Sequence, residues 1–293
     1  MLVIVLGVLS ALSWGLGDFG GGLTSRRVPV AGVLLLSQVA GAAMSLGLAV
    51  LLREAGPAPA DIGWSLASSL FGAAGLSCLY IGLARGRMGV VAPVTGVLVA
   101  AIPAVAGIIV EGVPRAAVLV GIVVAISSVL VVSRVGDAAD GRPSGLRWGV
   151  AAGLTLGAVT LTLSQMTTGL VFGPLTIMRL GEAGLIGLFV LGAGGRAGAR
   201  LLGRTESPAW RVPTRLWPAV IAVGAFDMLG TGFYIAATQA GPLAIAGVLS
   251  ALYPVTTVIL AVTILREQLA RWHLVGIALS AVAIVLITTG SVG

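Results

Sequence analysis

The sequence predicts an all-α integral membrane protein with ten transmembrane helices, arranged as two inverted-topology repeats of five helices each. The prediction rests on the composition, on ten apolar segments and on an internal repeat. The chain is 58% hydrophobic and only 9% charged, whereas about 25% of the residues of a soluble domain are charged. A chain of this composition cannot cover a water-soluble globule with polar side chains, so we expect lipid to surround it.

Charged residues and turn residues divide the chain into ten apolar segments, each close to the roughly 20 residues that a membrane span requires. We place the spans at residues 2–23, 29–52, 63–84, 89–110, 116–134, 148–169, 173–194, 216–238, 242–264 and 272–290. We interpret the first segment as a retained helix rather than a signal peptide. It lacks a basic region before the apolar run, and Trp14 and Asp18 interrupt that run.

The C-terminal half of the chain repeats a pattern of the N-terminal half. Each copy has a tyrosine, a short turn, an apolar run with a proline, and then a glutamate, an arginine and a glycine. The members are Tyr80, Pro103, Glu111, Arg115 and Gly121 in the first copy and Tyr234, Pro254, Glu267, Arg271 and Gly276 in the second. An internal repeat in a membrane protein is typical of secondary transporters.

Five helices in each half is an odd number, so the second repeat must enter the membrane in the opposite orientation. We therefore assign residues 1–135 to the first repeat, 136–147 to a cytoplasmic linker and 148–293 to the second repeat. We expect the two glutamates at the helix ends, Glu111 and Glu267, to anchor the structure rather than to bind substrate.

The arginines indicate how the chain is oriented. Fourteen of the 17 basic residues fall in loops on one side of the proposed membrane, Arg53 and Arg115 fall on the other, and Arg179 lies within a span. Because cytoplasmic loops are rich in basic residues, we place the fourteen in the cytoplasm and both termini outside. We expect a multi-pass protein of the plasma membrane, as a monomer or a homodimer.

Several classes of function are disfavoured by the residues that the chain lacks. There is no lysine, so the chain has no phosphate-binding loop of the Gly-x-x-x-x-Gly-Lys type. The single cysteine excludes a disulfide within the chain. One cysteine and one histidine also disfavour a zinc site built from protein ligands. We expect no cofactor and no metal, and we attribute the net charge of +7 to topology rather than to nucleic-acid binding.

The order and spacing of several short segments resemble the EamA-type branch of the drug/metabolite transporter superfamily over nearly the whole length. These segments are Ser13-Trp14-Gly15, the stretches around Tyr80 and Tyr234, Tyr253-Pro254, Arg266-Glu267 and the stretch around Gly276. The resemblance implies a ten-helix inverted-repeat carrier that exports small metabolites or drugs. Members of such families are often assigned cytoplasmic termini, whereas the charge distribution of this chain favours external ones.

Polar residues inside the spans are the first candidates for function, because charge at membrane depth is costly. Asp227 is the deepest, and Thr231 and Tyr234 follow it at i+4 and i+7 on the same helix face. They predict either a cavity wall with a titratable carboxylate or a carboxylate that hydrogen-bonds neighbouring hydroxyls to fix packing.

Arg179 and Glu182 lie three residues apart in the seventh span. They form either a local ion pair, with Arg179 near enough to the outer end to snorkel to water, or a substrate clamp whose members change partners between states.

Trp14 and Asp18 lie one turn apart in the first span. A shift of 147 residues places Gln165 opposite Asp18, which predicts a shared cavity near the pseudo-axis. Alternatively, Asp18 is a solvated or salt-bridged residue near a helix end. Three tyrosines are further candidates: Tyr80, Tyr234 and Tyr253. They either stack on a ligand or hydrogen-bond it, or they are buried residues whose hydroxyl needs only one hydrogen-bond partner.

The sequence therefore predicts a secondary transporter of small molecules that works by alternating access, and not an enzyme. Its expected partners are a small-molecule substrate, the lipid bilayer and protons. The alternatives are an integral membrane enzyme or channel, or an uncoupled facilitator. Poor solvation favours the protonated form of a carboxyl group, so Asp227 is the candidate for exchanging a proton with the substrate.

Overall fold

The computed structural model describes residues 2–111, 115–134, 143–163, 165–166, 169–192, 211–240, 246, 249–266 and 271–290, and the regular elements in these ranges are helical. The helices are α1 (Leu2–Ser25), α2 (Val30–Leu51), α3 (Pro59–Arg85), α4 (Met88–Glu111), α5 (Ala116–Arg134), α6 (Leu146–Leu163), α7 (Phe172–Gly192), α9 (Trp217–Ala240), α11 (Tyr253–Leu265) and α12 (Arg271–Gly290), with a 3₁₀ turn η1 (Thr214–Leu216) before α9. Each predicted apolar segment overlaps one of these helices. Glu267, the side chain of Glu111 and most of the predicted linker lie outside the described residues.

Six helices are long and apolar enough to cross a membrane by length and composition: α1, α2, α3, α6, α7 and α9 together with η1. Shorter apolar helical stretches lie at Met88–Ile102, Leu119–Ser128, Tyr253–Leu265 and Leu274–Leu286. Helices suit such a chain because every backbone N–H and C=O inside a bilayer must find its partner within the protein. The all-helical architecture and the apolar helices agree with the predicted membrane protein.

Local chemistry explains where individual helices begin and end. Asp61 lies in the first turn of α3, where its carboxylate accepts a hydrogen bond from the backbone N–H of Ala58 at 3.2 Å. α6 ends at Leu163, six residues before the predicted end, because a polar stretch with Gln165 and a left-handed Gly169 follows it. Arg266 takes a left-handed conformation, with φ of 51°, directly after α11.

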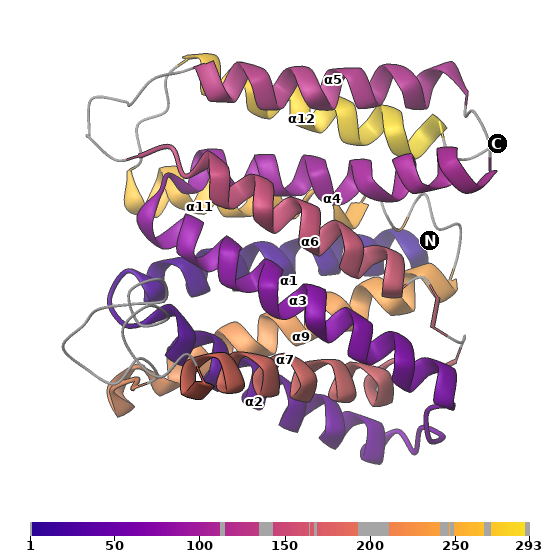
Figure 1. Ribbon diagram of the computed structural model, residues 1–293, viewed down its shortest axis with the longest axis vertical. Coiled ribbons are helices and arrows are strands. Elements are labelled where there is room, and N and C mark those ends of the chain that lie inside the picture. Colours follow the sequence, from indigo (N-terminus) through magenta and orange to yellow (C-terminus); the bar gives the residue numbers. More distant parts are fainter. Residues whose placement is uncertain are drawn as a thin grey trace.

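The helices pack in pairs that join the two halves of the chain (Figure 1). α1 lies against α9, and α3 lies against α6. Exchanging the two predicted five-helix repeats would turn the first of these pairs into the second. α5 and α12 pair at one edge of the bundle, and α2 and α7 pair at the other. The same exchange would convert each of these two edge pairs into itself, because each pair joins corresponding helices of the two predicted repeats.

The surface of this bundle carries many large apolar side chains, unlike that of a soluble protein. Large apolar side chains are exposed on the outer faces, including Leu51, Val123, Leu188 and Trp272. Serine and threonine side chains instead join helices inside the bundle, as Ser68 does with Thr162 at 2.7 Å between their hydroxyl oxygens. This arrangement is expected where lipid covers the surface and small polar residues hold the helices together.

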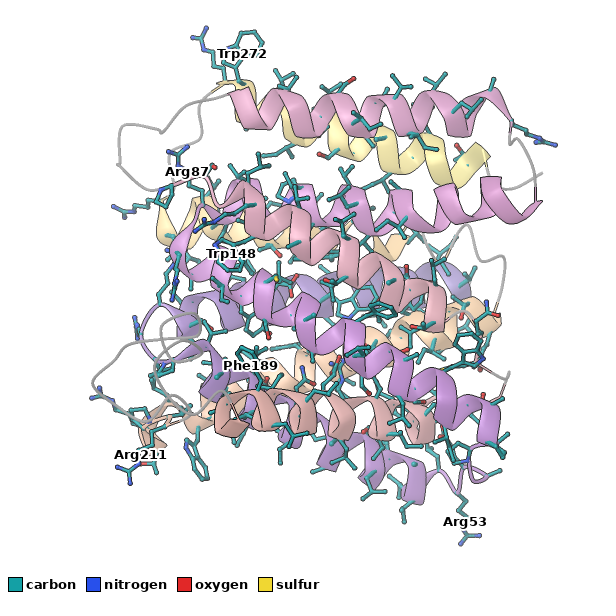
Figure 2. The ribbon with its side chains drawn as sticks, in the orientation of Figure 1. Arg53, Arg87, Trp148, Phe189, Arg211 and Trp272 are labelled. Carbon is teal, nitrogen blue, oxygen red and sulfur yellow. The ribbon has the colours of Figure 1, made fainter. Side chains whose placement is uncertain are left out.

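The two ends of the bundle differ in the side chains that they carry. α1 begins and α12 ends at the same end of the molecule (Figure 1). Arg53 lies at that end, whereas Arg87 and Arg211 lie at the opposite end (Figure 2). The sequence-based assignment likewise placed Arg53 on one side of the membrane and Arg87 and Arg211 on the other.

Candidate functional site

Arg179 of α7 is the centre of a buried polar cluster. Its Nη1 donates to Oδ2 of Asp227 at 2.6 Å, to Oε2 of Glu182 at 3.1 Å and to Oε1 of Gln38 at 3.0 Å. Its Nη2 donates to the hydroxyl of Thr231 at 2.8 Å and to the backbone carbonyl of Asp227 at 3.2 Å. One guanidinium therefore joins α2, α7 and α9.

Glycines allow these helices to approach closely enough for the contacts to form. A side chain at Gly224 of α9 would collide with the backbone carbonyl of Ser37 on α2, and a Cβ at Gly41 would lie 3.3 Å from the carbonyl oxygen of Gly224. Gln38 lies between Ser37 and Gly41 in sequence, so this crossing brings its amide to Asp227, with 3.4 Å between Nε2 and Oδ2.

The cluster is almost closed to its surroundings. The side chains of Arg179 and Glu182 are 2% and 0% exposed, and that of Asp227 is 14% exposed. Asp227 is thus the most exposed of these three side chains. Oε1 of Glu182 and Nε of Arg179 are buried without a hydrogen-bond partner among the described residues. A side chain at Gly72 of α3 would collide with the carboxylate of Glu182.

α1 extends the cluster with aromatic groups. The indole N–H of Trp14 donates to the hydroxyl of Thr231 at 3.2 Å. The Trp14 ring lies 5.6 Å from the Tyr234 ring and 6.0 Å from the Tyr253 ring, centroid to centroid, the latter edge-to-face. Gly230 provides the space, since a side chain there would collide with the indole.

Asp18 lies one turn beyond Trp14 and is 8% exposed. It is within electrostatic range of Asp227, Tyr80 and Tyr253. Asp18 makes no hydrogen bond or ion pair with another residue of the described ranges. The salt bridge that the sequence allowed for Asp18 is therefore not present among the described residues.

The structure corrects two sequence-based expectations. Gln165 is exposed in the turn after α6, where its N–H donates to the carbonyl of Thr162 at 3.2 Å. It does not face Asp18, because α6 has already ended. Arg179 does not snorkel to the surface, because its side chain turns inward to two carboxylates.

The other predicted residues gather in one region of the bundle. Arg179, Glu182, Asp227 and Thr231 form the hydrogen-bonded cluster, and Trp14, Tyr234 and Tyr253 adjoin it through ring contacts. Tyr80 is buried against Gly21 of α1. Gln38 was not among the predicted residues, although a polar residue in the middle of an apolar span is a usable signal.

The comparisons with known proteins agree with this architecture. Residues 143–289, half of the chain, match the profile of the EamA-like transporter family. No curated protein matches the chain. One solved crystal structure is similar over 99% of this chain and 96% of its own, with a TM-score of 0.63 and 16% sequence identity, which is a likeness of fold alone. The protein is a multi-pass membrane protein that belongs to the EamA-like transporter family.

Proposed function

We propose that the protein is a secondary carrier that exports a small metabolite or drug by alternating access, in exchange for protons. The observation that carries the proposal is the link from Arg179 to Asp227. α7 and α9 have few other contacts with each other, while both pack extensively on α2. A 2.6 Å ion pair thus joins two helices that little else joins directly.

Such an ion pair suits a switch better than a structural brace. Burying an ion pair is weak evidence for stability, because desolvation offsets most of the attraction. Asp227 is partly accessible and directs one oxygen to Arg179. A proton or a substrate group that binds Asp227 competes with Arg179 for this carboxylate and frees α9 to move relative to α7. Glu182 keeps the guanidinium paired during the exchange.

The helix pairing supports alternating access around this site. A ten-helix inverted repeat is expected to have two states that differ by exchange of the roles of its halves. The α1–α9 and α3–α6 pairs are related by that exchange. The Arg179 cluster draws Gln38 from the first half and Thr231 from the second, so movement between the halves acts on the site directly.

Counterflow in proteoliposomes tests the proposal. Vesicles are loaded with an unlabelled candidate compound, and a trace of the radiolabelled compound is added outside. A carrier accumulates label transiently above equilibrium, whereas a channel only equilibrates it. An imposed proton gradient should then drive net accumulation, and an ionophore that collapses the gradient should abolish it. Accumulation that the ionophore does not change would contradict proton exchange.

A second test needs no substrate. Thr231→Cys in a Cys78→Ala background places one thiol beside Arg179. A carrier should expose this thiol to a membrane-impermeant maleimide from each side in turn. Reaction from one side alone, in vesicles of both orientations and with or without a pH gradient, would contradict alternating access.

A further inference from the structure

The region around Arg179 contains more carboxyl groups than this guanidinium pairs with. Asp18, Glu182 and Asp227 carry buried or nearly buried carboxyl groups, and Arg179 is the cation that contacts Glu182 and Asp227 among the described residues. Arg179 pairs with two of the three. A charged carboxylate without a partner is costly in a low-dielectric interior, and a cation that pairs with it offsets that cost, so the third carboxyl group has the capacity to pair with a further cation.

Asp18 is the carboxylate with this capacity. It is more than nine-tenths buried, and no residue of the described ranges donates a hydrogen bond to it. Backbone geometry places it beside the cluster, because a Cβ at neighbouring Gly17 would lie 3.4 Å from the backbone nitrogen of Asp227. The third carboxyl group, that of Glu182, pairs with Arg179 and lies against Gly72 of α3.

Aromatic rings flank Asp18 along one face of α1. Trp14, Asp18 and Gly21 follow one another at i, i+4 and i+7, so they share that face. Trp14 contacts the Tyr253 ring edge-to-face, and Gly21 lies against the Tyr80 ring. The carboxylate thus lies between an aromatic pair one turn before it and a third ring one turn after it.

We propose that Asp18, Trp14, Tyr80 and Tyr253 form a subsite for the ammonium group of an organic cation. An ammonium ion supplies the hydrogen-bond donors and the positive charge that Asp18 lacks. Aromatic rings attract such cations through their negative faces, and a carboxylate beside them adds charge complementarity. The inference rests on the proposed carrier function and names its substrate class.

A set of three probes with one aromatic body tests the subsite. They are 2-phenylethylammonium, 2-phenylethanol and phenylacetate, which differ in the charge of the head group. Binding of tritiated 2-phenylethylammonium to the full-length protein in lipid nanodiscs is measured by scintillation proximity, with the unlabelled compounds as competitors. We expect the cation to compete about tenfold more strongly than the alcohol, a difference of about 1.4 kcal/mol, and phenylacetate to compete least.

Variants assign the effect to Asp18. Asp18→Asn should weaken binding of the cation about tenfold or more and leave 2-phenylethanol unchanged, whereas Asp18→Glu should retain part of the preference. Asp61→Asn is the matched control, since it neutralises a buried carboxylate at the start of α3, where the amide oxygen is still able to accept from Ala58. Tyr253→Phe should keep the affinity, and Tyr253→Leu should lower it for the cation only.

The outcomes separate this inference from the carrier proposal. Equal competition by cation and alcohol, undiminished cation binding in a folded Asp18→Asn protein, or preferred binding of phenylacetate would each overturn the subsite. None of these results bears on counterflow or on labelling of the thiol at position 231. If Asp18→Asn does not fold, as judged by thermal unfolding, the Tyr253→Phe and Tyr253→Leu pair decides the question.

Discussion

The carboxylate of Glu54 accepts hydrogen bonds from the backbone N–H of Phe172, the first residue of α7. The donor–acceptor distances are 3.1 Å to Oε1 and 2.9 Å to Oε2. The neighbouring N–H groups of Val171 and Gly173 donate to the same carboxylate at 3.2 and 2.8 Å. Glu54 follows α2 in sequence, so it fixes the start of the helix that carries Arg179 by satisfying N–H groups that have no partner within the helix.

We therefore expect Glu54→Ala to destabilise the protein by about 1–2 kcal/mol, as loss of a helix N-cap does. Glu54→Gln should cost less, because an amide oxygen still accepts but carries no charge. Scanning fluorimetry in detergent should show the order wild type, Gln, Ala in the unfolding temperature. An Ala variant as stable as wild type would contradict the capping role.

Arg179 has two carboxylate partners, so its variants should not be equivalent to those of Glu182. Arg179→Gln leaves two buried carboxylates without a counterion, which should cost about 3–5 kcal/mol of stability. Glu182→Gln leaves the 2.6 Å pair with Asp227 in place and should cost much less. Unfolding temperatures compare the two. Equal losses would mean that Arg179 serves Glu182 alone.

Asp227→Asn removes the carboxylate that pairs with Arg179 and that we propose binds the proton. We expect transport to fall about tenfold to a hundredfold, the equivalent of one charge-assisted hydrogen bond of roughly 1.5–3 kcal/mol. The double variant Arg179→Gln with Asp227→Asn should be more stable than Arg179→Gln alone, because one stranded charge is gone. Normal counterflow by Asp227→Asn would assign this residue to helix packing.

Gly72 and Gly63 of α3 offer a matched test of the space around Glu182. A side chain at Gly72 would collide with the Glu182 carboxylate, whereas nothing lies within 4 Å of a Cβ at Gly63. Gly72→Ala should destabilise the protein by about 1–3 kcal/mol through overpacking. Gly63→Ala should be neutral or stabilise it by up to about 1 kcal/mol, because alanine favours helix.

Shortening Glu182 serves as the second half of that test. Glu182→Asp should recover part of the loss caused by Gly72→Ala, because the shorter carboxylate withdraws from the added methyl group. The cycle is read from unfolding temperatures of the two single variants and the double variant. Simple additivity of the two changes would show that the methyl group and the carboxylate do not meet.

The division of arginines between the ends predicts that both termini face outside. A cytoplasm-dependent reporter fused after Gly293 should be silent, and the same reporter inserted in the loop at residues 136–144 should be active. The reverse pattern would place the Arg53 end of the bundle (Figure 2) in the cytoplasm.

The sequence by itself determined the solvent, the helices and the residues worth examining. An apolar run near 20 residues long has few alternatives to a helix in lipid, and a charge within it is too costly to be incidental. For this reason Asp227, Arg179 and Glu182 were identifiable without coordinates. The pair of Arg179 with Glu182 was also predictable, because residues three apart in a helix are neighbours.

Only the tertiary structure decided which distant groups meet. Asp227 lies 48 positions from Arg179 and Gln38 lies 141 positions from it, and no local spacing encodes either contact. The crossing of α2 with α9 at Gly41 and Gly224 brings Gln38 to Asp227, and it became visible only when the helices were packed. The same reason explains the error at Gln165. The 147-residue shift paired Gln165 with Asp18 by position alone, whereas α6 ends at Leu163, before Gln165.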